Sequence, residues 1–117
     1  MTGTDIQGLQ QKLTEFAKER DWEQFHSPKN IVMALNVEAS ELLEHFQWLT
    51  EEESSQLSEE KLQQVGTEIA DVFLYLIRLS QLLNIDIMQA SVDKMEENAH
   101  KYPAEKVRGS HKKYNEY

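Results

Sequence analysis

With 117 residues, 39% of them hydrophobic and 28% charged, the chain is large enough for one globular domain with a single core. The absence of cysteine excludes a disulfide framework, and the net charge of −9 argues against a nucleic-acid partner, because binding phosphates requires a basic face. No apolar run is long enough to span a bilayer and the first ten residues are polar, so we expect a cytoplasmic protein without a membrane partner.

Hydrophobic residues recur at helical spacing along most of the chain, and hardly any segment alternates as a strand does. The first such segment predicts a helix over about 6–20. Ser27 followed by Pro28 is typical of a helix start, with an N-cap and a proline at the first helical position. The pattern that follows predicts a second helix to about residue 48 or 49.

The middle of the chain is predicted to be a polar linker followed by a long helix. Thr50 and Glu53 form a capping-box pattern in the linker over 50–60, which indicates at most one acidic turn there. The third helix is predicted over about 61–83, and Asn84 suits the position just past its end.

The last predicted helix begins at Asp86, which forms a second capping-box pattern with Gln89, and reaches Lys101 before Pro103 stops it. The remainder, 104–117, reads as a basic tail. Four helices without strands predict an all-α fold, and we expect a single domain over residues 1–117.

Residues 69–77 are apolar all around the predicted helix apart from Asp71. A helix that is apolar on every side needs neighbours on every side. One copy of this chain offers too few helices for that, so the pattern predicts a homo-oligomer that completes the bundle. The alternative is a monomer in which the third helix is central and the others surround it.

Two pairs of acidic residues stand three apart on predicted helices, Glu38 with Glu41 and Glu68 with Asp71. This spacing puts each pair on one helical face, within reach of a shared ion. Glu38 falls near the middle of the apolar stripe of its helix, and Asp71 interrupts the apolar run of the third. An ionised carboxylate in such surroundings must protonate, pair with a base or bind a metal.

A metal is the favoured partner of these carboxylates. The alternative is a buried salt bridge, but the nearest basic residues, Lys61 and Arg78, lie towards the ends of the third helix. Oxygen ligands without cysteine suit a hard cation, and we expect Mg²⁺. A di-iron bundle would need two Glu-x-x-His motifs, and the chain has one, Glu97 with His100.

The two acidic motifs, together with the blocks over 20–30 and 95–114, resemble the MazG-like nucleotide pyrophosphohydrolases, and among them the dCTP pyrophosphatase-like branch. The resemblance covers almost the whole chain. It implies a four-helix MazG-like bundle that is completed as a dimer or tetramer. It also implies that Glu38, Glu41, Glu68 and Asp71 bind Mg²⁺, and that a nucleoside triphosphate is cleaved to the monophosphate and pyrophosphate.

The same resemblance implies a nucleotide pocket formed by aromatic and polar residues. They are Trp22, Phe25, His26, Trp48 and Tyr75, with Asn98 near the sugar or phosphates and Tyr102 in the C-terminal block. From the residues alone, the aromatic rings near helix ends could stack a base or pack in the core. His26 could contact a base or phosphate, or lie in a surface turn.

Base specificity is expected to be loose. Related eukaryotic enzymes carry a base-contacting histidine on the first helix where this chain has Leu13, which offers no hydrogen bond. Basic residues near the C-terminus could neutralise a triphosphate or form a solvated tail. These are Lys94, Lys101, Lys106 and Arg108.

The resemblance implies cleavage at the α–β phosphate linkage. The residues favour metal-assisted hydrolysis, with Glu41, at the edge of the apolar stripe, as general base. Two rival functions stay open at this point. One is an acidic helical module that binds a protein partner, and the other is a nucleotide-binding regulator without turnover.

Overall fold

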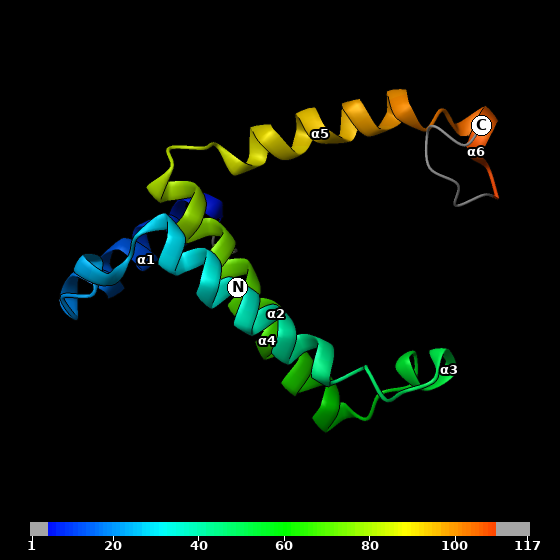
Figure 1. Ribbon diagram of the computed structural model, residues 1–117, viewed down its shortest axis with the longest axis horizontal. Coiled ribbons are helices and arrows are strands. Elements are labelled where there is room, and N and C mark those ends of the chain that lie inside the picture. Colours follow the sequence, from blue (N-terminus) through cyan, green and yellow to red (C-terminus); the bar gives the residue numbers. More distant parts are fainter. Residues whose placement is uncertain (1–4, 110–117) are drawn as a thin grey trace. The chain divides into compact units, whose positions relative to one another are not determined.

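The computed structural model describes residues 5–109, and the regular structure in this range is helical, as predicted (Figure 1). The chain forms two compact units, one up to Asn84 and one from Ile85. The first contains α1 (Ile6–Glu19), the 3₁₀ helix η1 (Glu23–Phe25), α2 (Pro28–Glu44), α3 (Glu51–Ser54) and α4 (Glu59–Leu82), and the second contains α5 (Ile87–Lys101) and α6 (Ala104–Val107).

Local side-chain hydrogen bonds fix where the helices begin. Ser27 caps α2 by accepting from the Asn30 backbone N–H, with Pro28 at the first position as predicted. Thr50 and Glu53 form the complete capping box of α3. The long helix α4 begins two residues before the predicted start because Ser58 caps it.

Two predicted details of the helix ends are wrong. The box at Asp86 is only half formed, since Asp86 accepts from the Gln89 backbone but the Gln89 side chain donates to Asp93 instead. The second helix ends at Glu44 rather than at residue 48 or 49, because the chain tightens into turns there. The position of Asn84 past α4 is confirmed by its left-handed φ of 56°.

The core of the first unit lies where α2 and α1 pack against α4. The most extensive contact joins α2 and α4, which run antiparallel side by side (Figure 1). Buried apolar side chains come from all three helices, and are Ala17, Ile31, Val65 and Ile77. Antiparallel packing brings the middle of α2, with its acidic pair, against the middle of α4, with the second pair.

A large apolar surface of α2 and α4 stays exposed in the single chain. Ile77 is fully buried, yet its neighbours Ile69, Phe73 and Leu76 are exposed on the same helix. Val32, Leu35 and Ala39 of α2 line a shallow groove with Val72 and Leu76. Within the first unit, α1 and α2 therefore leave part of the apolar run over 69–77 uncovered.

The second unit consists of α5 and a short helix that the sequence placed in a basic tail. Pro103 ends α5 and precedes α6, so Ala104–Val107 is helical rather than irregular. The rest of the predicted tail from residue 110 lies outside the described residues. Between residues 5 and 109, every helix is too short or too polar to cross a membrane.

Candidate functional site

Three of the four predicted carboxylates gather between α2 and α4. One carboxylate oxygen each from Glu38, Glu41 and Glu68 lies within 4.8 Å of the others. Glu38 Oε2 and Glu68 Oε2 are buried and have no hydrogen-bond partner. Buried polar oxygens are nearly always paired in folded proteins, so these two indicate a missing electropositive partner.

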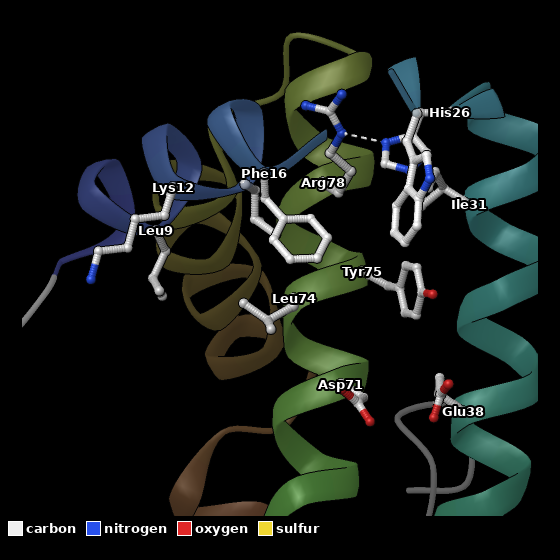
Figure 2. A pocket seen from close by; sticks show the side chains of 12 residues that line it. Leu9, Lys12, Phe16, His26, Ile31, Glu38, Asp71, Leu74, Tyr75 and Arg78 are labelled. Atoms are coloured by element: carbon white, nitrogen blue, oxygen red, sulfur yellow. Dashed lines mark hydrogen bonds between the residues drawn. The ribbon is translucent and has the colours of Figure 1, made fainter. Parts of the chain in front are cut away.

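Asp71, the fourth predicted ligand, lies outside that group. Its side chain is one methylene shorter than that of glutamate and reaches less far from α4. It lines the adjoining pocket together with Glu38, and the two carboxylates face each other there (Figure 2). The sequence expectation of four gathered carboxylates is therefore met by three, with Asp71 placed across the pocket.

Burial and the neighbouring carboxylates change the protonation of Glu38. Burial, followed by the neighbouring Glu68 and Glu41 side chains, raises the pKa of Glu38 to about 7. Burial and the charges of Glu38 and Asp71 also raise the pKa of the Tyr75 hydroxyl. The site thus concentrates negative charge that a cation would relieve.

A pocket of about 480 Å³ extends from Glu38 and Asp71 along α4 towards α1 and the residues that flank η1. Tyr75 lies between the carboxylate end and the end formed by His26 and Arg78 (Figure 2). Trp22 lines the pocket as well. The remaining lining residues are Leu9, Lys12, Leu13 and Phe16 of α1, Ile31 of α2 and Leu74 of α4.

Two aromatic residues that the resemblance placed in the pocket lie outside it. Phe25 is 59% exposed and Trp48 is 86% exposed, and neither lines the pocket of this chain. Trp48 lies in the turns after Glu44, beyond the end of α2. The longer predicted helix would have placed it on a face of α2. A nucleotide contact by either residue stays a prediction.

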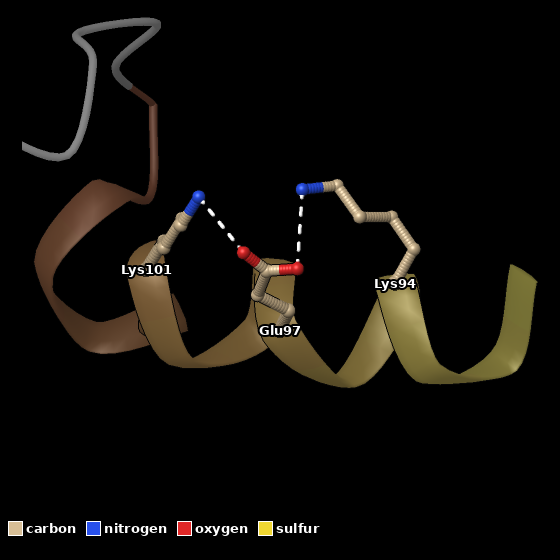
Figure 3. A network of polar contacts seen from close by, with 3 residues as sticks. All are labelled: Lys94, Glu97 and Lys101. Carbon is tan, nitrogen blue, oxygen red and sulfur yellow. Dashed lines mark hydrogen bonds and ion pairs between the residues drawn. The ribbon is translucent and has the colours of Figure 1, made fainter. Parts of the chain in front are cut away.

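The basic residues of α5 are already paired. Lys94 Nζ lies 3.3 Å from Glu97 Oε2, and Lys101 Nζ lies 3.0 Å from Glu97 Oε1 (Figure 3). The two lysines lower the pKa of Glu97, so this residue of the Glu-x-x-His motif serves ion pairing in this structure. Binding of phosphates by these lysines stays a prediction. The same holds for the predicted nucleotide contacts of Asn98, Tyr102 and Arg108.

Arg78 is the main pocket residue that sequence reasoning missed. In the sequence it is only a possible salt-bridge partner near a helix end, yet in the structure it is buried and donates to His26. Its position seven residues after Asp71 and three after Tyr75 puts all three on one face of α4. This spacing is the feature of the sequence that could have identified Arg78 as a pocket residue.

Comparison with known proteins gives consistent matches. The MazG-like family matches residues 33–117. The dCTP pyrophosphatase 1 of Homo sapiens is 39% identical over 113 residues, which cover 95% of this chain and 66% of that protein. The Mus musculus protein of the same name is 38% identical over 111 residues, covering 93% and 65%. This chain thus spans just under two thirds of the length of these relatives.

A solved structure agrees with the fold. A pyrophosphatase from Archaeoglobus fulgidus superposes with a TM-score of 0.80 at 36% sequence identity. The superposition covers 88% of this chain and 96% of the archaeal one.

Proposed function

Because this chain belongs to the MazG-like family, we propose that it hydrolyses nucleoside triphosphates, with dCTP or a related deoxynucleotide as substrate, to the monophosphate and pyrophosphate. The observation that carries the proposal is the group of Glu38, Glu41 and Glu68, of which Glu38 also lines one end of a pocket with aromatic walls. The names of the relatives support the reaction class.

The residues present suit a hard divalent cation. The donor set contains only carboxylate oxygens, which Mg²⁺ prefers, and two of these oxygens are buried without partners. Glu38, Glu41 and Glu68 would hold the ion, and Asp71 faces Glu38 from the other side of the pocket. We therefore propose Mg²⁺ as the cofactor.

When bound, Mg²⁺ would neutralise charge on the phosphates and favour ionisation of a nearby water. Glu41, at the edge of the carboxylate group, is proposed to accept the proton of the water that attacks at the α–β linkage. Tyr75 borders the carboxylate end of the pocket.

The opposite end of the pocket offers a stacking surface for the base. Trp22 and Phe16 both line it and meet edge to face, with ring centroids 5.6 Å apart and planes at 71°. Arg20 covers Phe16, with its guanidinium carbon 3.7 Å from the ring centroid. These contacts keep the Phe16 ring in place, so the aromatic wall is preformed.

Release of pyrophosphate from a panel of deoxynucleoside triphosphates, with Mg²⁺ and with chelator, tests this function. The enzyme should turn over only with the divalent ion. A regulator that binds nucleotides would bind the panel without turnover, and a protein-partner module would neither bind nor hydrolyse it. Either of the latter results would contradict the proposal.

We also propose that the chain is a homo-oligomer, a dimer or tetramer, in which a second copy covers the exposed face of α4. The exposed residues Ile69 and Phe73 sit on a helix whose core position Ile77 is fully buried, and apolar patches of this kind mark association sites. Light scattering at micromolar concentration should give a multiple of 13.7 kDa. Phe73→Glu should dissociate the oligomer because it buries a charge.

The matched control is Phe25→Glu, which adds the same charge at an exposed phenylalanine of η1 outside this face. It should leave the mass unchanged. A stable wild-type species of 13.7 kDa, the mass of one chain, would contradict the proposed homo-oligomer.

A further inference from the structure

A chain of long-range hydrogen bonds fixes Arg78 at the end of the pocket away from the carboxylates. The side chain is only 8% exposed. Its Nε donates to His26 Nδ1 at 3.1 Å, and its Nη1 donates to Gln81 Oε1 at 3.2 Å. Gln81 in turn donates to the Gln10 carbonyl and to Thr14 Oγ1, both at 3.0 Å. The network therefore ties α1, α4 and the segment before α2 to one another.

This network determines which nitrogen of His26 carries the proton. A guanidinium has no acceptor, so the Nδ1 atom that faces Arg78 must be the acceptor of the hydrogen bond. His26 is then neutral, with its proton on Nε2. Burial and the Arg78 charge lower the pKa of His26, while Glu23 opposes the change. His26 lines the pocket, and its Nε2–H is a hydrogen-bond donor.

The guanidinium keeps donor capacity beyond these two bonds. It has five N–H groups, of which the network uses Nε–H and one on Nη1. None of the ion pairs found among residues 5–109 involves Arg78. A buried cation with only neutral partners is costly, and a ligand that supplies acceptors would lower that cost. Arg78 and His26 thus offer donors, and no acceptor, at this end of the pocket.

The distance to the carboxylates matches a nucleotide lying along α4. Seven residues separate Asp71 from Arg78, which corresponds to about 10 Å along a helix. Tyr75 lies between them (Figure 2). A nucleotide with its phosphates at the carboxylates would therefore place the far edge of its base near Arg78 and His26.

We propose that Arg78 and His26 select the base of the substrate by donating to two neighbouring acceptors on its edge, which among pyrimidines favours cytosine. The inference rests on the proposed nucleotide hydrolysis. Cytosine presents O2 and an unprotonated N3 side by side, whereas N3 of uracil and thymine carries a hydrogen that would meet another donor. Buried donors left unpaired are what makes a polar pocket discriminate.

Arg78 and His26 also change the base specificity that is expected from Leu13. Leu13 does line the pocket, and it offers no hydrogen bond. The expectation of loose specificity rested on Leu13 and did not include Arg78. Directed contacts from α4 and from the segment before α2 can supply the discrimination that α1 does not.

The test is the ratio of kcat/KM for dCTP to that for dUTP, which have rings of equal size and differ at this edge. The wild type should favour dCTP. Arg78→Gln, which replaces the cation by a group that both donates and accepts, should lower the ratio by about ten- to a hundredfold. Arg78→Lys and His26→Gln should also lower this ratio of kcat/KM values. They replace Arg78→Gln as the test if that variant does not fold. Lys18→Gln removes the same charge from an exposed site and should leave the ratio unchanged.

Two results would overturn the inference. One is a wild-type preference for dUTP. The other is a ratio of kcat/KM values that stays within about twofold of the wild type in all three variants, Arg78→Gln, Arg78→Lys and His26→Gln. If these variants lower kcat/KM equally for dCTP and dUTP, Arg78 contacts the phosphates instead of the base. Calorimetric binding of dCTP and dUTP with Ca²⁺ gives the Kd ratio without turnover. If no nucleotide is hydrolysed, the proposed function fails, and the Kd ratio still decides the role of Arg78.

Discussion

Glu38→Gln and Asp71→Asn should each reduce pyrophosphate release by roughly ten- to a hundredfold at saturating Mg²⁺, while the protein stays folded. Glu38 contributes an oxygen to the carboxylate group, and Asp71 faces it across the pocket. Both replacements keep the side-chain volume and remove only the charge. Steady-state release of pyrophosphate measures the effect, and circular dichroism checks the fold. Glu15→Gln, an exposed position on α1, is the matched control.

Near wild-type turnover by either variant would show that the metal site is assigned to the wrong residues. Loss of activity together with loss of helix content would be a folding effect. If one of the two variants, Glu38→Gln or Asp71→Asn, unfolds in this way, the activity of the other tests the assignment of the metal site.

Glu38→Gln should also change how the free energy of unfolding depends on pH in the absence of divalent ions. The pKa of Glu38 rises from 4.5 to about 7 in the folded chain, so the folded state holds a proton that the unfolded state has lost. The wild type should therefore lose stability as the pH rises from about 4.5 to about 7. Glu38→Gln should not show this loss. Urea unfolding in chelator at several pH values measures it, and parallel curves for the two proteins would contradict the raised pKa.

Trp22→Ala should raise the Kd of a deoxynucleoside triphosphate by roughly ten- to a hundredfold, because stacking on an aromatic side chain contributes about 1–3 kcal/mol per base. Trp22 lines the pocket and contacts Phe16 edge to face. Trp22→Phe keeps a π-face and should recover most of the affinity. Calorimetry with Ca²⁺ measures binding without turnover. Equal losses in both variants would indicate a packing role rather than stacking.

Trp48 provides an independent check on the arrangement of subunits. The resemblance assigns it the same stacking role, but it is 86% exposed and lies outside the pocket of its own chain. A loss of affinity in Trp48→Ala that matches Trp22→Ala would therefore require a second subunit to bring Trp48 to the pocket. No loss would restrict stacking to Trp22 and Phe16.

The sequence predicts those features that depend on local interactions. The helix over Pro28–Glu44 begins at a cap and a proline, both of which act within one turn. The position of Glu38 in an apolar stripe follows from helical periodicity alone, and the structure shows one of its oxygens buried without a partner. These conclusions need no knowledge of how the helices pack.

Features that depend on packing between helices were not predictable in the same way. Arg78 was read as a charge near a helix end, because only the approach of His26, 52 residues earlier in the chain, makes it a buried pocket residue. The early end of α2 at Glu44 interrupts a periodic pattern that continues in the sequence. Asp71 matched the metal motif by spacing, but the reach of its shorter side chain could be judged only in three dimensions.

Identification of the products formed from dCTP tests the central claim most directly. The protein and dCTP are incubated with Mg²⁺, and the nucleotides and phosphates are separated by anion-exchange chromatography. We expect equal amounts of dCMP and pyrophosphate, neither product in chelator, and strongly reduced amounts of both with Glu38→Gln. Formation of dCDP and phosphate, or of no product from any deoxynucleoside triphosphate with Mg²⁺ present, would contradict it.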